Sequence, residues 1–109
     1  MLNGGTSLGT IRVNNSYIQL SNSSDSIGNG SYVKALINNS TIINSGTASG
    51  ISNTTNFGTL QITNSLIYAT TTPINYTGTA SVIVSNFTTN VPCVGSIIGE
   101  FDLISDLTF

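Results

Sequence analysis

Apolar residues recur at regular intervals along this chain, in short segments that polar turns separate. The clearest copies of the pattern are residues 8–16 (LGTIRVNNS) and 57–65 (FGTLQITNS). Anchoring the repeat on its asparagine aligns Asn15, Asn39, Asn64 and Asn86, at spacings of 24, 25 and 22 residues. A repeat of this length predicts a structure built from similar units stacked on one another.

Apolar columns flank each of these asparagines. Four residues before it stand Ile11, Ala35, Leu60 and Val82, and two residues before it stand Val13, Ile37, Ile62 and Val84. Three residues after it stand Ile18, Ile42, Ile67 and, as an exception, Thr89. Side chains alternate along an extended strand, so the two columns before the asparagine share one face. We expect that face to point inward.

A second series of isoleucines predicts another inward strand in each repeat. Its members are Ile27, Ile51, Ile74 and Ile97, at spacings of 24, 23 and 23 residues. Turn-forming residues separate the segments, and the many β-branched residues, glycines and asparagines exclude a helical period. The pattern predicts an all-β chain, a β-solenoid of about four coils whose strands pair about 4.8 Å apart.

The asparagines and the serines that follow them have a structural interpretation. Asparagine tolerates left-handed backbone geometry, and stacked asparagine amides can form hydrogen bonds along the axis. We therefore expect an asparagine ladder at each turn. Ser16, Ser40 and Ser65 are interpreted as a second turn ladder rather than as nucleophiles.

The repeated pattern apolar-x-apolar-x-Asn-Ser resembles that of the pectate-lyase-type right-handed parallel β-helix, over roughly residues 8–98. The resemblance implies this fold but no single function, because polysaccharide lyases and hydrolases, adhesin passengers, and virus or phage spikes and fibres share it. We expect β-helix coils over residues 1–98 and a capping or oligomerisation segment over residues 99–109.

Charge excludes some functions. The 109 residues contain two Lys or Arg, four Asp or Glu and no His. Two separated cations cannot form a nucleic-acid footprint, and no apolar run is long enough for a membrane-spanning helix. We therefore predict no nucleic-acid partner and no membrane insertion. The single Cys93 is expected to be a small buried apolar residue.

The ionisable residues do not suggest catalysis. Sugar hydrolysis uses two facing carboxylates, and Glu100, Asp102 and Asp106 form the one acidic cluster. We interpret that cluster as a solvated face of the terminal segment rather than as an acid–base pair or a calcium site. Arg12 and Lys34 do not share a column, so a lyase-type basic site is also unsupported. The sequence predicts no enzyme, no cofactor and no metal.

Outward positions favour contact with a partner, because several of them are apolar. The candidate subunit-interface residues are Leu36, Ile43, Leu66 and Ile83, together with Phe101, Leu103, Leu107 and Phe109 of the tail. Among the four tyrosines, Tyr17 and Tyr68 are the candidates for stacking on sugar rings. These positions predict a homotrimer, which is either a mechanical stalk or a tip that contacts a cell-surface glycan. The alternative role of the tyrosines is packing in the core or at a subunit interface.

The resulting hypothesis is a structural, C-terminal segment of a trimeric viral or phage fibre or spike. Such a segment would lie outside cells or on the virion surface and take part in host attachment. Two alternatives remain at this point. One is a fragment of a polysaccharide-degrading β-helix enzyme, and the other is a bacterial surface adhesin passenger.

Overall fold

The computed structural model describes residues 2–3, 9–21, 23–28, 33–53, 59–77 and 81–107. Within these ranges the chain is all-β, with twelve strands and no helix. Every pairing between strands is parallel. The predicted all-β class is confirmed.

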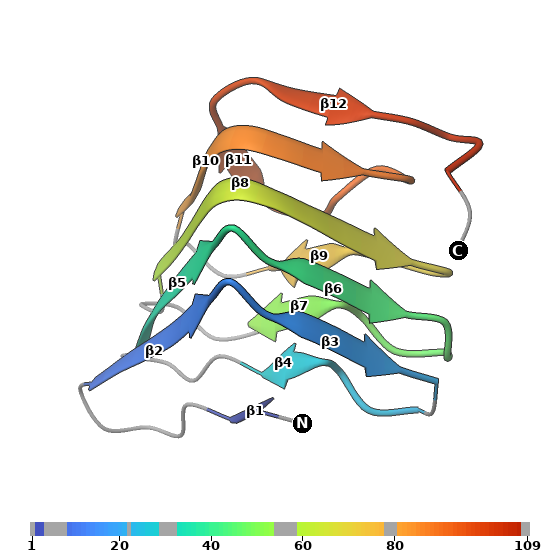
Figure 1. Ribbon diagram of the computed structural model, residues 1–109, viewed down its shortest axis with the longest axis horizontal. Coiled ribbons are helices and arrows are strands. Elements are labelled where there is room, and N and C mark those ends of the chain that lie inside the picture. The colour runs from blue at the N-terminus through green and yellow to red at the C-terminus, as the bar shows by residue number, and fades with distance from the viewer. Residues whose placement is uncertain are drawn as a thin grey trace.

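The strands form two sheets (Figure 1). The smaller sheet has the order β1 (Leu2–Asn3), β4 (Ile27–Gly28), β7 (Ile51–Asn53) and β9 (Ile74–Tyr76). The larger sheet contains β2 (Gly9–Asn14), β3 (Tyr17–Leu20), β5 (Val33–Asn38), β6 (Thr41–Asn44), β8 (Thr59–Ala69), β10 (Ser81–Thr89), β11 (Ser96–Ile98) and β12 (Phe101–Leu103).

Strand partners lie one repeat apart in the sequence. We call a layer the strands of the larger sheet that lie at one level: β2–β3, β5–β6, β8, β10 and β11–β12, in that order. The register follows the predicted columns, since Ile11 pairs with Ala35, Ala35 with Leu60, and Leu60 with Val82. The sequence repeat is therefore the spacing between parallel neighbours.

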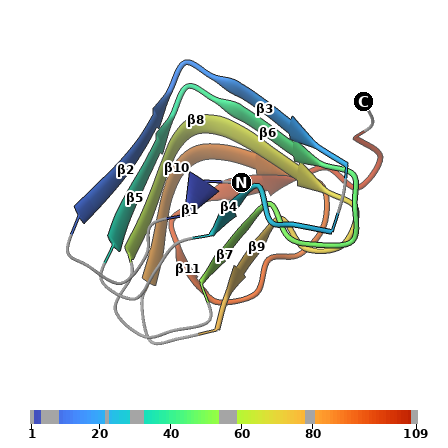
Figure 2. The same ribbon diagram turned by 90° about the horizontal axis from the view of Figure 1, so that it is seen from below.

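Each of the first four layers bends at its asparagine. Figure 2 shows the bend between β2 and β3, between β5 and β6, and within β8 and β10. The φ angles are 50° at Asn15, 49° at Asn39, 50° at Asn64 and 53° at Asn86. These are left-handed conformations, which asparagine adopts more readily than most residues. The predicted backbone geometry of the asparagine column is confirmed.

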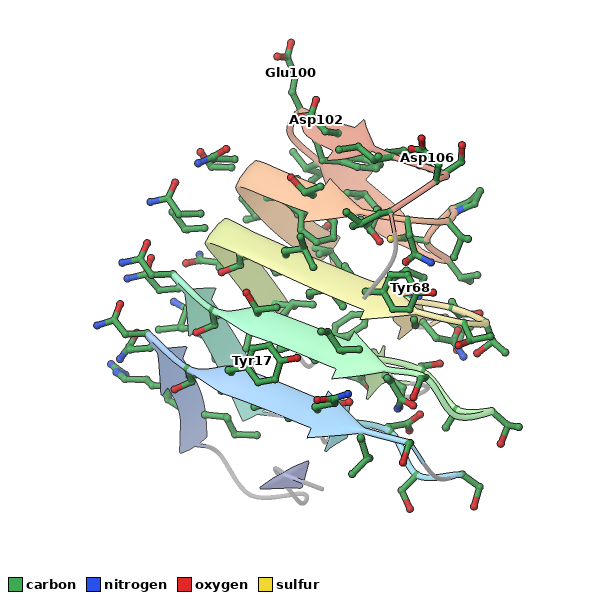
Figure 3. All side chains as sticks on the ribbon, turned by 45° about the vertical axis from the view of Figure 1, so that its right-hand side comes forward. Tyr17, Tyr68, Glu100, Asp102 and Asp106 are labelled. Carbon is green, nitrogen blue, oxygen red and sulfur yellow. The ribbon has the colours of Figure 1, made fainter. Side chains whose placement is uncertain are left out.

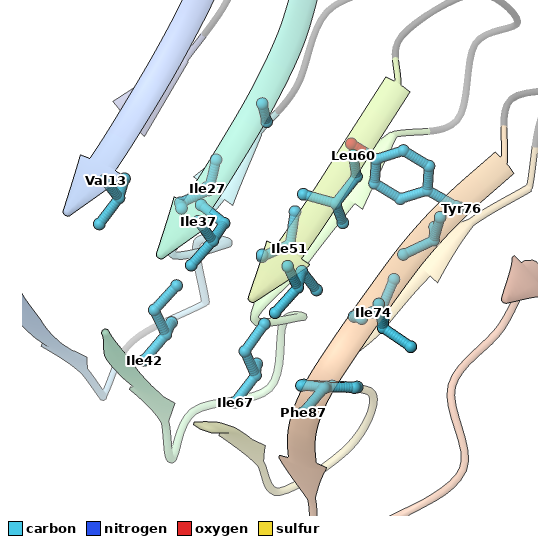
Figure 4. Packing of buried hydrophobic residues seen from close by; sticks show 14 residues of the cluster. Val13, Ile27, Ile37, Ile42, Ile51, Leu60, Ile67, Ile74, Tyr76 and Phe87 are labelled. Atoms are coloured by element: carbon cyan, nitrogen blue, oxygen red, sulfur yellow. The ribbon is translucent and has the colours of Figure 1, made fainter. Parts of the chain in front are cut away.

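The apolar core lies between the two sheets (Figure 4). The smaller sheet contributes Ile27, Ile51, Ile74 and Tyr76. The larger sheet contributes the predicted inward columns, among them Val13, Ile37, Ile42, Leu60 and Ile67. It also contributes Phe87, which was not predicted to point inward and which pairs in register with Ser65. Four further apolar residues pack against this core but are only partly buried. Ile11 and Ile18 belong to the first layer, Ile97 belongs to the last, and Cys93 lies between β10 and β11.

The position predicted for Ile97 is wrong. Ile97 pairs with Val82 and so belongs to the column of Ile11, not to that of Ile74. The position beside β9 is occupied instead by Val94, three residues before Ile97. There the Val94 N–H donates to the Ile74 carbonyl oxygen, and the Val94 carbonyl oxygen accepts from the Tyr76 N–H, both at 2.8 Å. Cys93, the neighbour of Val94, thereby packs on the core.

The last layer turns without an asparagine. Two residues, Gly99 and Glu100, separate β11 from β12, where β10 has three residues between Ile83 and Phe87. Gly99 has a φ of 117°, and a Cβ there would clash with the Val84 carbonyl oxygen. Only glycine fits this corner. The boundary expected at residues 98 and 99 falls inside this layer, and both β11 and β12 pair with β10.

Candidate functional site

The serine column forms the predicted hydrogen-bonded ladder at the bends. The Ser16 N–H donates to Ser40 Oγ at 3.1 Å, and the Ser40 N–H donates to Ser65 Oγ at 3.0 Å. Each of these hydroxyls also donates to the carbonyl oxygen two residues before it in the chain. All three hydroxyl protons, and the oxygens of Ser40 and Ser65, are thus engaged with the backbone, which supports a structural role and not a nucleophilic one.

The asparagine column is exposed and forms part of the same corner. Asn86 Nδ2 donates to Asn64 Oδ1 at 2.8 Å, which is a ladder bond of the predicted kind. The column ends at Asn86, because the layer above turns at Gly99. Above Asn86, a hollow is lined by Asn86, Phe87, Gly99, Glu100, Phe101 and Asp102.

The three acids of the tail are exposed and do not all lie together. Glu100 and Asp102 lie at the rim of this hollow, and Glu100 points away from the protein at its end (Figure 3). Asp106 lies apart from both in the turn after β12, and all three side chains are exposed. Within the described residues, no group of three His, Cys, Asp or Glu is placed to hold a metal ion.

The basic residues are also separate. Arg12 pairs in register with Leu36, whereas Lys34 pairs with Thr10 and Thr59, so the two occupy different columns as predicted. The fourth acid, Asp25, has a structural role that the sequence did not reveal. Its carboxylate accepts from the Ser49 N–H at 2.8 Å and from Ser52 Oγ at 2.6 Å, which ties the first turn to the next repeat.

Cys93 is a poor nucleophile in this environment. Burial raises the pKa of its thiol to about 11, and the neighbouring Ile74 backbone and Thr89 side chain offset this rise only in part. The thiolate is the reactive form of cysteine, so a raised pKa lowers reactivity at neutral pH. The residue packs on the core as the sequence predicted, but it is only partly buried.

The two candidate sugar-stacking tyrosines lie on one outer face, that of β3, β6 and β8 (Figure 3). Tyr17 is 61% exposed, and its hydroxyl donates to Gln19 Oε1 at 3.3 Å. Tyr68 is half-buried. The two rings belong to layers two steps apart, or about 10 Å along the stack at the usual strand spacing. Tyr76 is different, because it is buried in the core.

Ile43 is not an exposed interface residue, and its assignment is wrong. Its side chain is 1% exposed, although it does not belong to the central core cluster. In the ladder it lies between Gln19 and Tyr68, whose long side chains flank it at the distance between adjacent strands. The alternation of side chains along the strand predicts only that Ile43 points outward. Whether Ile43 is exposed to water depends on the side chains of the two neighbouring strands, which cover it here.

The other candidate interface residues differ in exposure. Leu36 and Leu66 are half-buried, and Ile83 is 48% exposed. In the tail, Leu107 is half-buried and Leu103 is 45% exposed, while Phe109 lies outside the described residues. Phe101 is 37% exposed and packs on Phe87, with ring centroids 5.7 Å apart.

Exposed apolar residues that the sequence reasoning missed also lie near the tail. Ile98 is 52% exposed and pairs in register with Ile83, and Val94 and Ile104 are exposed as well. Ile98 was not predicted to be exposed because Ile97 was assigned to the wrong column. In the observed register Ile98 pairs with Ile83 and points outward beside it. Of the large apolar side chains described as exposed, all but Tyr17 belong to residues 83–104.

Comparison with known proteins found no match. No family model matches the chain, and no curated protein and no solved structure is similar to it at a significant level. Among the described residues, no helix has the length and apolar character needed to cross a membrane. Two surfaces remain as candidate functional features. One is formed by the exposed apolar residues between positions 83 and 104, and the other is the outer face that carries Tyr17 and Tyr68.

Proposed function

We propose that this chain is a right-handed parallel β-helix that serves as a structural segment of a homotrimeric viral or phage fibre or spike, exposed outside cells and used in host attachment. The β-helix part of the proposal is supported by the parallel registers, one repeat apart, in both sheets. On this interpretation the described strands form five layers. The sequence showed only four because the fifth turns at Gly99. The viral or phage part rests on the family resemblance alone.

One observation carries the trimer: the contiguous exposed pair of Ile83 and Ile98. Both side chains point outward from adjacent strands, and about half of each is open to water. Single exposed apolar residues are ordinary, but a contiguous patch is a mark of a contact surface. Three parallel copies can bring this patch together around one axis, because the patch lies on the side of the stack and near one end.

The same arrangement leaves the tyrosine face outside. Tyr17 presents an exposed ring with a polar group at its edge, which is the combination that stacks on a sugar ring while hydrogen bonding to its hydroxyls. Tyr68 lies farther along the same face. We include a cell-surface glycan as the partner of this face.

The decisive experiment is the mass in solution, measured by light scattering after size exclusion. A species at three times the chain mass of 11.3 kDa supports the proposal. Ile83→Lys should convert it to monomer. The matched control is Thr10→Lys, an exposed position of β2 in the first layer, which should leave the trimer intact.

A wild-type monomer would overturn the trimer and favour the adhesin or enzyme-fragment alternatives. The glycan contact has its own measurement on the same proteins. Binding to an array of cell-surface glycans should be lost in Tyr17→Ala and kept in Thr10→Lys. Equal binding by both variants would remove Tyr17 from the proposal.

A further inference from the structure

One outward column of the larger sheet runs from the exposed pair of Ile83 and Ile98 down the side of the stack. The strand registers place its five members above one another: Arg12, Leu36, Gln61, Ile83 and Ile98. We call this set the outer column. Arg12 and Ile83 lie three layers apart, or about 14 Å along the stack at the usual strand spacing (Figure 1). A partner that contacts Ile83 along the side of the stack therefore also faces Arg12.

Short side chains flank the upper part of the outer column. On one strand, residues two positions apart lie on the same face, so each member has a neighbour before it and after it. The neighbours of Gln61, Ile83 and Ile98 include Thr59, Thr63, Ser81, Ser85 and Ser96. The longer side chains of the outer column consequently project beyond those beside them. Identical chains can therefore approach one another closely along this column.

Arg12 brings a positive charge to this column, and its side chain is exposed. The structure describes all four acids of the sequence, and none of them pairs with Arg12. The Asp25 carboxylate accepts hydrogen bonds from Ser49 and Ser52, and the other three acids lie in or after the last layer. Lys34 lies on the same sheet face as Arg12, in the adjacent column. Among the described residues, this face therefore carries both cations and no acid.

A hollow lies beside Arg12 on this face. Its lining includes Arg12, Asn14, Leu36 and Asn38, and none of the residues described in that lining is acidic. A guanidinium presents five N–H donors, and each asparagine amide presents two. The hollow thus gathers hydrogen-bond donors around one cation, which is the chemistry that binds oxyanions.

We propose that three copies of Arg12 converge on the three-fold axis of the trimer and bind one inorganic oxyanion of the phosphate or sulfate type. The inference rests on the proposed function, because it places the axis beside Ile83 and Ile98. Three guanidinium groups at one level repel one another, and the repulsion grows as water is excluded between the chains. A tetrahedral oxyanion removes this repulsion, since each guanidinium can donate two parallel N–H bonds to its oxygens. The Asn14 amide, two residues from Arg12 on the same face, supplies a further donor.

The first test compares trimer formation in phosphate and in chloride, at equal pH and ionic strength, by sedimentation equilibrium. Inorganic phosphate at about ten times its dissociation constant should raise the apparent association constant of the trimer about tenfold. Sulfate, in a parallel series, should act in the same direction. Calorimetric titration should give one phosphate for every three chains. A trimer that responds to neither anion would overturn this inference and leave the proposed function intact.

The second test assigns the response to Arg12. Arg12→Gln should form the trimer in chloride at least as well as the wild-type protein, because the repelling charges are gone, and it should no longer respond to phosphate. Lys34→Gln is the matched control. It removes the same charge from the same face but from the adjacent column, so the phosphate response should remain.

Two results with these variants would overturn the inference: a phosphate response that persists in Arg12→Gln, or one that disappears in Lys34→Gln. Circular dichroism of each variant establishes that its strands remain folded. Wild-type protein that is monomeric in both phosphate and chloride would overturn the proposed function and this inference together. The oligomeric mass and the anion response thus separate the two failures.

Discussion

The inner layers and the last layer use the same kinds of inward residue but bury them to different extents. Ile42 and Ile67, in the second and third layers, are fully buried, because each has a neighbour above and below in the same column. Leu103 ends that column and remains nearly half exposed. In this fold an apolar side chain is therefore buried by its neighbours along the stack as much as by the opposite sheet.

The corners differ in the same sense. In the first three layers a serine directly follows the asparagine of the bend. The backbone N–H of each of the first two serines donates to the Oγ of the serine in the next layer. In the fourth and fifth layers the equivalent positions are Phe87 and Phe101. A polar ladder thus gives way to an aromatic pair near the end of the stack. The change indicates that the packing of Phe87 on Phe101 helps to hold the last two layers together.

The largest expected effect contrasts two positions of one column. Ile67→Ala should cost about 2–5 kcal/mol of unfolding free energy, because it opens a cavity in a fully packed core. Leu103→Ala should cost about 1 kcal/mol or less in the monomer, since nearly half of that side chain is already in water. Chemical denaturation at low protein concentration measures both. Equal losses would mean that the last layer is as well packed as the interior.

An intermediate effect is expected at the corners. Asn64→Ala should cost about 1–2 kcal/mol, because alanine resists the left-handed conformation that Asn64 adopts. The variant also loses the hydrogen bond that Asn86 donates. Asn64→Gly should recover most of the loss, since glycine accepts positive φ freely. Glu100→Ala, at the exposed last corner, should change stability by less than about 0.5 kcal/mol. A Gly variant as unstable as the Ala variant would show that the amide ladder, not the backbone, dominates.

The smallest effect concerns Cys93, at the junction of the core and the last layer. With a thiol pKa of about 11, the folded protein should react slowly with alkylating reagents near pH 8 and faster as pH rises. The folded pKa lies above the reference thiol value of 9.0, so ionisation opposes folding. Stability should be unaffected below pH 9 and should fall as pH rises from 9 toward 11. Cys93→Ala, compared by denaturation over the same range, should lack this part of the decline. Rapid alkylation of native protein at pH 8 would instead indicate that the last layer opens readily.

The local pattern was sufficient for most of the architecture. Alternation within each short strand identified the inward columns, and the asparagine after them identified the bend, because few residues accept a left-handed conformation. The serine ladder followed from the same alignment. These features depend on residues close together in the chain or on a repeat that is visible in the sequence.

The sequence by itself thus determined the strands, most of the inward faces and the bends. Tertiary structure decided the register of the last layer, where the bridge at Val94 moved Ile97 to another column. It also decided that Ile43 is covered while Ile98 is exposed. The physical reason is that alternation sets only the face on which a side chain lies. Its burial, and hence its availability to a partner, depends on which side chains the parallel ladders place above and below it.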